Sequence, residues 1–295
     1  MSRVGIVIAS RDRKEELLRT LPRHRELPER PSVVLVDDAS SDGTTGAVRE
    51  RHPEVQVITL ARNEGAAARN HGLRALDTPY VALCDDDSWW QPGALGRAVE
   101  IMDAHPGLAV LQGHVLVGPQ ERDDPVCVEM AQSPLPRADG QPGHPLLSFV
   151  ACAVVLRREA ALSVGGFSTR LHIGGEEELM GWDLVARGWQ LSYVPEVLAH
   201  HHPPPNDGRP GRREIGIRNT LWTTWLRRPV RPAVTRTLRD VRRFPRDRTT
   251  ARGLGRALAG APWILRERAV SPPHVEEMLR MLEDQQLRSE ARRYV

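Results

Sequence analysis

The sequence predicts an α/β protein built on a Rossmann-like, mostly parallel mixed sheet that helices flank. Short continuous apolar runs, typical of strands buried on both faces, recur through the first two thirds of the chain. Helical segments separate these runs, and this alternation implies right-handed crossovers between parallel strands. Several runs are followed directly by acidic residues, which should gather at the edge where the carboxyl ends of the strands open.

The first part of the chain follows this pattern regularly. The apolar runs are bounded by polar or turn residues, and the first helical segment starts just after a polar stretch that can cap it. Strands are predicted over residues 4–9, 33–36, 55–60 and 80–84. Helices are predicted over residues 14–21, 45–51 and 66–76.

The second part is less regular. A helix over residues 92–104 and a strand over 108–112 precede residues 118–146, where six prolines and little periodicity predict a long irregular loop. A strand over 149–156, a short helix over 157–164, a helix over 176–187 and a strand over 190–195 follow.

The remaining residues predict a basic, mainly helical C-terminal region. Helical patterns cover residues 212–227, 232–243 and 275–292, and residues 209–268 hold 17 arginines against four acids. We therefore predict a main domain over residues 1–205, with halves 1–115 and 116–205, and a C-terminal region over 206–295.

The bulk composition is that of an ordinary globular protein. Of the 295 residues, 40% are apolar and 27% charged, and no apolar run reaches the roughly 18 residues of a transmembrane helix. The first strand begins too early for a signal peptide, and the three scattered cysteines predict neither a disulfide framework nor a zinc site. We expect a cytoplasmic protein, with the inner face of the membrane as the alternative location.

Three consecutive carboxylates, Asp85, Asp86 and Asp87, directly follow the predicted strand over residues 80–84. Negative charges on one turn repel one another, and a hard divalent cation such as Mg²⁺ or Mn²⁺ relieves that repulsion. An acidic solvent-facing turn or a helix cap is the alternative. Taken alone, the triplet leaves both interpretations open.

Five motifs occur together in a fixed order. They are residues 33–44 (VVLVDDASSDGT), 62–72 (RNEGAAARNHG), 83–87 (LCDDD), 165–167 (GGF) and 175–178 (GEEE). Each is weak or moderate alone, but in this order the chain resembles the family 2 glycosyltransferases of the GT-A fold over residues 3–205. The resemblance implies an inverting enzyme that moves a sugar from a nucleotide-diphosphate sugar to an acceptor hydroxyl. Residues 1–115 would bind the nucleotide and residues 116–205 the acceptor.

The resemblance implies nucleotide contacts at the carboxyl ends of the strands. Asp38, supported by Asp37, is expected to accept a hydrogen bond from the base, commonly uracil in the family; an Asx turn is the alternative. The forked guanidinium of Arg69 suits a phosphate. The further candidates are Ala9, Arg11, Arg62, Asn63, Asp85 and Asp86, and ordinary solvated helix residues are an equal alternative for Arg62 and Asn63.

The ends of the acidic triplet match the D-x-D element of the family. Asp87 is expected to bind Mn²⁺ or Mg²⁺ directly, and Asp85 to contact the ribose, or the metal through water, while Asp86 points away. The metal would neutralise the departing diphosphate. His200 or His202, just after the last predicted strand, is expected to complete the site; zinc is a weaker alternative because no cysteine or HExxH pattern accompanies these histidines.

The predicted displacement also needs a carboxylate that takes the proton from the attacking acceptor hydroxyl. The family usually has Glu-Asp at this position, whereas this chain has Glu176, Glu177 and Glu178, which lengthens the side chain and leaves the register open by one residue. Glu177 is the first choice, with its two neighbours as the other candidates. Three solvated acids in the first turn of a helix are the alternative.

Five residues are candidates for the acceptor or sugar pocket. They are Gly165, Gly166, Phe167, Trp89 and Trp90. A plain helix stop is the alternative for the two glycines, and core packing is the alternative for the tryptophans.

The basic C-terminal region interleaves arginines with tryptophans. Contact with an anionic membrane surface fits this composition better than nucleic acid, for which no binding motif is present. A solvated face, pairing with the acids of the chain itself, or a homodimer contact are the alternatives. Arg218 and Asn219 are expected to reach back toward the active site.

The expected partners are a UDP- or dTDP-sugar donor and a sugar, lipid-linked or small-molecule acceptor, in polysaccharide, glycolipid or natural-product glycoside synthesis. A sugar-phosphate nucleotidyltransferase is one rival, but it needs a glycine-rich loop after the first strand, and residues 9–13 contain no glycine. A non-catalytic nucleotide-sugar-binding protein is the other, and it should lack the carboxylates that this chain retains.

Overall fold

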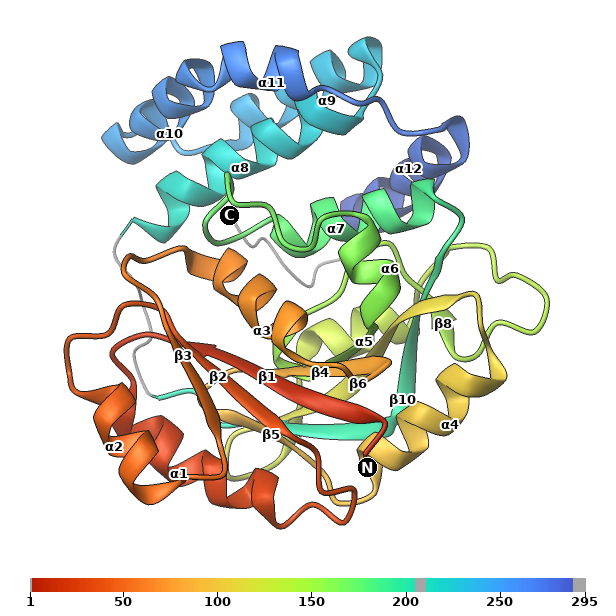
Figure 1. The fold of residues 1–295 in the computed structure, drawn as a ribbon. Coiled ribbons are helices and arrows are strands. Elements are labelled where there is room, and N and C mark those ends of the chain that lie inside the picture. The colour runs from red at the N-terminus through yellow and green to blue at the C-terminus, as the bar shows by residue number, and fades with distance from the viewer. Residues whose placement is uncertain (1, 205–210, 289–295) are drawn as a thin grey trace.

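The computed structural model describes residues 2–204 and 211–288, which form a sheet with helices on both faces and a helical layer at one end (Figure 1). The main strands lie in the order β3-β2-β1-β4-β9-β6-β10-β5. These are β1 (Val4–Ser10), β2 (Val33–Asp37), β3 (Gln56–Thr59), β4 (Tyr80–Cys84), β5 (Ser88–Trp90), β6 (Leu108–Val117), β9 (Val154–Arg157) and β10 (Gln190–His201). Two short strands, β7 (Arg122–Asp123) and β8 (His144–Pro145), pair with β6 and β10.

Most of the strands on this path run in one direction. β3, β2, β1 and β4 are paired in parallel. β9 is antiparallel to both β4 and β6, so β6 and its parallel neighbour β10 point the same way as the first four strands. The predicted mostly parallel sheet is confirmed, and the carboxyl ends of these strands open at one edge.

Helices on both sides explain the continuous apolar runs. Figure 1 shows α1 (Lys14–Arg25), α2 (Thr44–Arg51) and α4 (Ala94–Ala104) below the sheet, and α3 (Arg69–Ala75), α6 (Arg158–Ser163) and α7 (Glu176–Ala186) above it. Every residue of β4 is buried, as are all but one of β1. Strands without a solvent face have no polar positions to alternate with the apolar ones.

Three predicted segments differ from the structure. The expected irregular loop contains the helix α5 (Pro125–Ala131), which begins where the Asp124 carboxylate accepts a hydrogen bond from the backbone N–H of Val126 at 2.8 Å. The expected strand over 149–156 begins as the single turn η2 (Ala151–Ala153) before β9. The last strand was predicted too short, because β10 continues past a bulge and pairs with both β6 and β5.

The C-terminal region is helical, as predicted, but the sequence pattern missed two of its helices. The described part holds α8 (Arg212–Arg227), α9 (Val230–Arg243), α10 (Arg248–Ala259), α11 (Ala261–Glu267) and α12 (Pro273–Arg288). The glycines at 253, 255 and 260 have low helix propensity, and they weaken the helical pattern over α10 and α11. Residues 289–292 of the predicted last helix and the boundary at 205/206 lie outside the described residues, so the division into domains stays a prediction.

The C-terminal region packs on the main domain through a second apolar cluster. Leu171 and Leu179, beside and within α7, belong to this cluster with residues of α8, α10 and α11. Further away, Glu283 of α12 accepts hydrogen bonds from Arg228, Arg236 and Arg239. Burial opposes ionisation of Glu283, but these arginines lower its pKa to about 2. None of the helices in residues 2–204 and 211–288 has the length and apolar character needed to cross a bilayer.

Candidate functional site

The acidic triplet lies on a tight turn between β4 and β5, at the carboxyl edge of the sheet. The Ser88 hydroxyl accepts a hydrogen bond from the backbone N–H of Asp85 at 2.8 Å and donates one to the carbonyl of Cys152 at 3.1 Å. The backbone N–H of His202 donates to the carbonyl of Asp87 at 2.9 Å. The end of β10 is therefore held against this turn, although the two segments lie far apart in the sequence.

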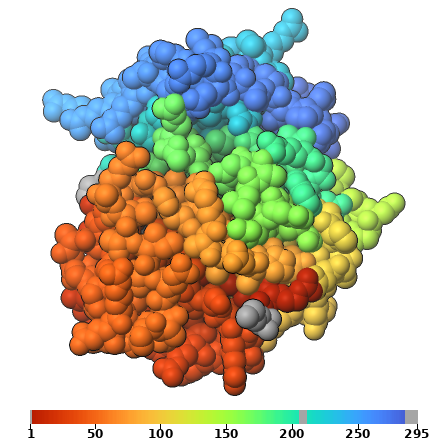
Figure 2. All heavy atoms as spheres, in the orientation of Figure 1, coloured from red at the N-terminus to blue at the C-terminus, as the bar shows by residue number. Residues whose placement is uncertain are grey.

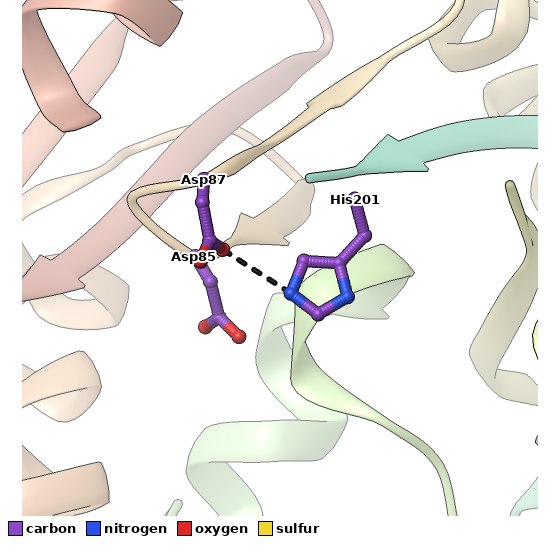
Figure 3. Close-up of side chains that lie close together, drawn as sticks. All are labelled: Asp85, Asp87 and His201. Carbon is purple, nitrogen blue, oxygen red and sulfur yellow. Dashed lines mark ion pairs between the residues drawn. The ribbon is translucent and has the colours of Figure 1, made fainter. Parts of the chain in front are cut away.

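Two aspartates and one histidine share a common space at this turn. Ligand atoms of Asp85, Asp87 and His201 all lie within 4.8 Å of one another (Figure 3). Nε2 of His201 is 3.2 Å from Oδ1 of Asp87. Burial lowers the pKa of His201, but the Asp87 carboxylate outweighs burial and raises it above the ordinary value. Two carboxylates and an imidazole are a donor set that fits Mn²⁺, and carboxylates also suit Mg²⁺.

The predicted choice between His200 and His202 is corrected, because the structure places His201 beside the aspartates. Successive side chains of a strand point to opposite faces. Nε2 of His200 lies 2.8 Å from Oε1 of Gln91, and its ring stacks on Trp89 with centroids 5.3 Å apart. The ring of His202 meets the same indole edge-on at 4.6 Å. The extension of β10 determines which face of the strand each of the three histidines occupies, and the sequence pattern did not predict this extension.

Asp86 faces away from this space, as expected for the middle of the triplet. Its carboxylate accepts hydrogen bonds from the Ser10 hydroxyl at 2.7 Å and from Nε of Arg13 at 3.2 Å. Burial raises its pKa to about 6. Asp86 therefore stabilises the turn through Ser10 and Arg13, and this placement argues against its inclusion among the nucleotide contacts.

Arg13 contacts the acidic turn, and the sequence analysis did not name it as a candidate. Its Nη2 donates to Oδ2 of Asp87 at 3.0 Å, so one guanidinium spans Asp86 and Asp87. Arg11, the predicted candidate on the same loop, is exposed and lies beside Asp12. The position of both arginines on the loop after β1 could have marked them as candidates. Which of the two contacts the acidic turn depends on how α1 packs, and the sequence does not show this.

Arg69 connects the acidic turn to the glutamates of α7. Its Nη2 donates to Oδ1 of Asp85 at 2.6 Å, and its side chain is only 12% exposed. Burial alone would lower the pKa of Arg69, but the negative charges of Asp85, Glu177 and Glu176 raise it above the usual arginine value. Arg69 therefore lies between a predicted metal ligand and the predicted base candidates.

The three glutamates of α7 differ in their surroundings. Glu176 is 3% exposed, and one of its carboxylate oxygens is buried without a hydrogen-bond partner. Glu177 is half-buried, and burial raises its pKa although Arg69 opposes this. Glu178 lines a separate cavity of about 670 Å³ between α5, α7 and α12. Among the three, Glu177 combines access from solvent with the charge of Arg69.

The two aspartates at the end of β2, Asp37 and Asp38, hold the loops around them in place. Asp37 accepts a hydrogen bond from the backbone N–H of Ser40 at 2.9 Å, three residues on, so its side chain holds the turn that ends β2. The Asp38 carboxylate accepts from the backbone N–H groups of Glu64 and Gly65 at 2.7 and 2.9 Å. Each oxygen of Asp38 still has a second lone pair for a ligand donor.

The remaining nucleotide candidates lie around these loops. Ala9 is a partly buried residue of β1. The Arg62 side chain is 85% exposed and pairs with Glu64. Asn63 is exposed, and its side-chain oxygen accepts from the backbone N–H of Gly65 at 2.9 Å.

The predicted acceptor residues fall into two groups. Gly165, Gly166 and Phe167 line a cavity of about 390 Å³ beside α7 and the C-terminal region. Gly166 has φ +73°, and an added Cβ would lie 2.2 Å from Oδ1 of Asn70, so this turn needs glycine. The prediction that Trp90 contacts a sugar is wrong, because its side chain is fully buried.

Trp89 is also packed rather than open. Its side chain is 8% exposed, and the guanidinium of Arg23 lies 4.1 Å from the centroid of its ring. Together with the stacked His200, this contact covers the indole. The packing alternative therefore describes both tryptophans.

The loop before α7 is held by α8, where the sequence predicted a contact from Arg218 and Asn219. The buried Nδ2 of Asn219 donates to the carbonyls of Leu171, Ile173 and Gly174 at 2.9, 3.0 and 2.5 Å. Nη2 of Arg218 donates to the carbonyl of Leu171 at 2.8 Å. The C-terminal region therefore sets the position of the segment that leads into the glutamates.

Comparisons with known proteins agree with this geometry. The family model described as Glycosyl transferase family 2 matches residues 5–164. The pre-mycofactocin glycosyltransferase of Mycobacterium tuberculosis (strain H37Rv) is 32% identical over 215 residues, which are 68% of this chain and 43% of that protein. The N-acetylglucosaminyl-diphospho-decaprenol L-rhamnosyltransferase of the same strain is 25% identical over 61% of this chain and 70% of its own.

Two solved glycosyltransferase structures share the fold. A mannosyltransferase of Pyrobaculum calidifontis, in complex with GDP-Man and Mn²⁺, matches 97% of this chain and 80% of its own with a TM-score of 0.57 and 20% identity. GalNAc-T7 with UDP, GalNAc and Mn²⁺ matches 90% and 56% with a TM-score of 0.62 and 15% identity. These matches confirm the predicted fold class. The chain spans less than half the length of the first relative named above.

Proposed function

The chain belongs to glycosyl transferase family 2, and from that premise we propose that it moves a sugar from a nucleotide-diphosphate sugar to an acceptor hydroxyl, with inversion. One observation carries the proposal. Arg69 is bonded to Asp85, and the negative charge of Glu177 also acts on its guanidinium, so a candidate metal ligand and a candidate base share one arginine.

In this proposal Glu177 is the general base. As the acceptor oxygen attacks the glycosidic carbon, the Glu177 carboxylate takes its proton, and the bond from that carbon to the diphosphate oxygen breaks. The support is its half-buried position beside Arg69. Glu176 is too enclosed to meet an acceptor directly, and Glu178 lies at a different cavity.

Asp85, Asp87 and His201 would hold Mn²⁺ or Mg²⁺ in the proposed site. When bound, the ion supplies a Lewis acid that neutralises the charge of the leaving diphosphate. Arg13 and Arg69, now paired with Asp87 and Asp85, are two cations at the same edge. Their planar guanidinium groups can turn from these carboxylates to phosphate oxygens when donor and metal neutralise the aspartates.

We propose UDP or dTDP as the nucleotide of the donor. Asp37 and Asp38 lie at the end of β2, and the free lone pairs of Asp38 can accept the imide N–H of uracil or thymine. The acceptor would be a sugar, a lipid-linked saccharide or a small molecule, and the enzyme would act in the cytoplasm.

The rival functions have weaker support. A nucleotidyltransferase needs a glycine-rich phosphate loop after β1, and residues 9–13 contain none. A non-catalytic binding protein would not need a carboxylate with a raised pKa near the candidate metal ligands. Glu177 is such a carboxylate.

The decisive experiment is a nucleotide-release assay over UDP-, dTDP- and GDP-sugars, each with Mn²⁺ or Mg²⁺. We expect release above background with one UDP- or dTDP-sugar, stimulated by an acceptor and abolished by excess EDTA. Release from a GDP-sugar only would overturn the proposal that the donor nucleotide carries uracil or thymine. Formation of a nucleotide sugar from sugar phosphate and nucleoside triphosphate would instead identify a nucleotidyltransferase.

Exchange of Asn219 for aspartate should slow sugar transfer without touching the reacting groups. It keeps the shape of the side chain but removes both N–H donors from the carbonyls of Leu171, Ile173 and Gly174. We expect unfolding free energy to fall by about 2 kcal/mol, because buried carbonyls lose their partners. Misplacement of α7 should lower kcat by on the order of tenfold or more.

Thr237→Val is the matched control for Asn219→Asp. It removes one hydrogen bond inside the C-terminal region, from Nε1 of Trp225 at 3.0 Å, and leaves the loop before α7 intact. Urea unfolding and kcat should be measured for both variants. If Asn219→Asp loses stability but keeps the kcat of Thr237→Val, Asn219 has no positioning role.

A further inference from the structure

An open apolar stripe lies on α9 in the C-terminal region. The residues of this stripe are Val230, Val234, Leu238 and Val241, and they are 59%, 40%, 51% and 39% exposed. At 100° per residue, these four positions fall within an arc of roughly 80° around the helix. Four aliphatic side chains therefore face solvent together along one line, which we call the α9 stripe.

Two arginines border the α9 stripe. Arg231 and Arg242 lie within about 40° of one edge of the stripe on the helical wheel, whereas Arg243, in the last turn, falls on the opposite side of the helix. All three are exposed, and none makes an ion pair with any residue in the described ranges 2–204 and 211–288.

The other arginines of α9 behave differently. Nη1 of Arg236 lies 2.9 Å from Oε1 of Glu283, and Nη1 of Arg239 lies 3.0 Å from Oε2 of the same carboxylate. Asp240 also contacts both. Pairing with the acids of the chain itself therefore accounts for the inner face of α9 and leaves the outer face basic and apolar.

We propose that the α9 stripe docks on an anionic lipid bilayer, with α9 lying in the plane of the membrane surface. Aliphatic side chains on one face with arginines at its border are the arrangement of interfacial helices. Long arginine stems let the guanidinium groups reach anionic headgroups while the aliphatic residues enter the acyl boundary. A nucleic acid would use the charge but would leave the aliphatic stripe in water.

The charge distribution of the whole chain favours the same orientation. Residues 209–268 carry a formal charge of +13 and the rest of the chain −10. Figure 2 shows the C-terminal region gathered at one end of the molecule, opposite the N-terminal elements. An anionic surface would attract the basic end and repel the rest, so the molecule would approach with the C-terminal region, which includes α9, first.

The test is co-sedimentation of the full chain with vesicles, scored independently of sugar transfer. We expect binding to vesicles of phosphatidylglycerol and phosphatidylcholine, weak binding to pure phosphatidylcholine, and loss of binding as salt screens the charges. Val234→Glu combined with Leu238→Glu should weaken binding by about tenfold or more. Arg231→Glu combined with Arg242→Glu should weaken it by a similar, salt-dependent factor.

Two controls keep this test sharp. Val128→Glu on α5, where Val128 is 48% exposed, changes an equally open valine outside α9, and Arg49→Glu on α2 reverses an exposed charge far from it. Both should bind vesicles like the parent protein, and all variants should unfold at similar temperatures. Parent-like binding by the stripe variants would overturn the proposal. The proposal would also be overturned if the parent protein formed a dimer that the stripe variants dissociate and did not bind vesicles. Tight binding of the parent protein to duplex DNA in place of vesicles would overturn it as well.

Discussion

Replacing Glu177 by glutamine should lower kcat for sugar transfer by about 100- to 10,000-fold, the range that a general base contributes. The amide keeps the size of the side chain and leaves the pair between Arg69 and Asp85 in place. It cannot take the proton of the acceptor hydroxyl. Donor affinity, measured by calorimetry, should change much less than kcat, because the lost interaction belongs to the transition state.

The neighbouring glutamates provide matched controls for this variant. Glu176→Gln changes a buried carboxyl with one unpartnered oxygen, and Glu178→Gln changes a residue at the cavity below α7. Both should retain much more activity than Glu177→Gln. A loss of activity confined to Glu176→Gln or Glu178→Gln would move the base by one position, and full activity in Glu177→Gln would remove it.

The pH dependence of kcat offers a second readout of the same residue. Burial raises the pKa of Glu177, and the base works only when ionised. Activity should therefore fall, as pH is lowered, at a pH above the ordinary glutamate pKa of about 4.3. The residual activity of Glu177→Gln should lack this acid limb. An acid limb at or below the ordinary value, or one that persists in the variant, would contradict the assignment.

Asp87→Asn should impair metal binding and sugar transfer together. The substitution weakens one ligand of the proposed site and the contacts of Asp87 with His201 and Arg13. The Mn²⁺ concentration for half-maximal activity should rise by more than the roughly 10–100-fold that loss of an outer-shell partner costs. Mn²⁺ binding should also be measured directly, by calorimetry or electron paramagnetic resonance, without a sugar donor.

Asp86→Asn is the control for the metal assignment. It alters the adjacent carboxyl, which is buried, accepts from Ser10, and shares the Arg13 guanidinium with Asp87. Mn²⁺ affinity should stay near that of the parent, although stability changes. Equal loss of Mn²⁺ binding in both variants would mean that the turn as a whole, rather than Asp87, determines metal binding. Full activity of the parent in excess EDTA would reject the metal.

Much of the sheet could be predicted because its signal is local. β1, β2 and β4 are continuous apolar runs whose ends lie within one residue of the predicted ends. Their parallel arrangement followed from the helices between them, and this placed the acidic triplet at the carboxyl edge. The short strand β5 and the extension of β10 carried no such signal, since both depend on pairing with strands far away in the sequence.

The crevice was predicted less completely for the same reason. Arg69 was predicted and lies against Asp85, but Arg13 was passed over for Arg11, which points into solvent. Trp90 looked like a sugar contact from its place after the acidic loop, yet pairing of β5 with β10 buries it completely. Position along the chain locates a loop, whereas packing of the loop decides which of its side chains face the crevice.

The sequence by itself determined the kind of sheet, the family, and the three clusters of the candidate site: an acidic triplet, a glutamate triplet and a histidine triplet. Within each cluster the residues are identical, so local composition cannot distinguish them. The resemblance had already singled out Asp85 and Asp87 within the acidic triplet, but only the tertiary structure decided that His201 joins them while His200 and His202 turn away. The physical reason is that contacts between segments far apart in the sequence decide which way the side chains of each cluster point. These contacts are the pairing of β10 with β5 and β6 and the hydrogen bonds from Asn219 to the loop before α7.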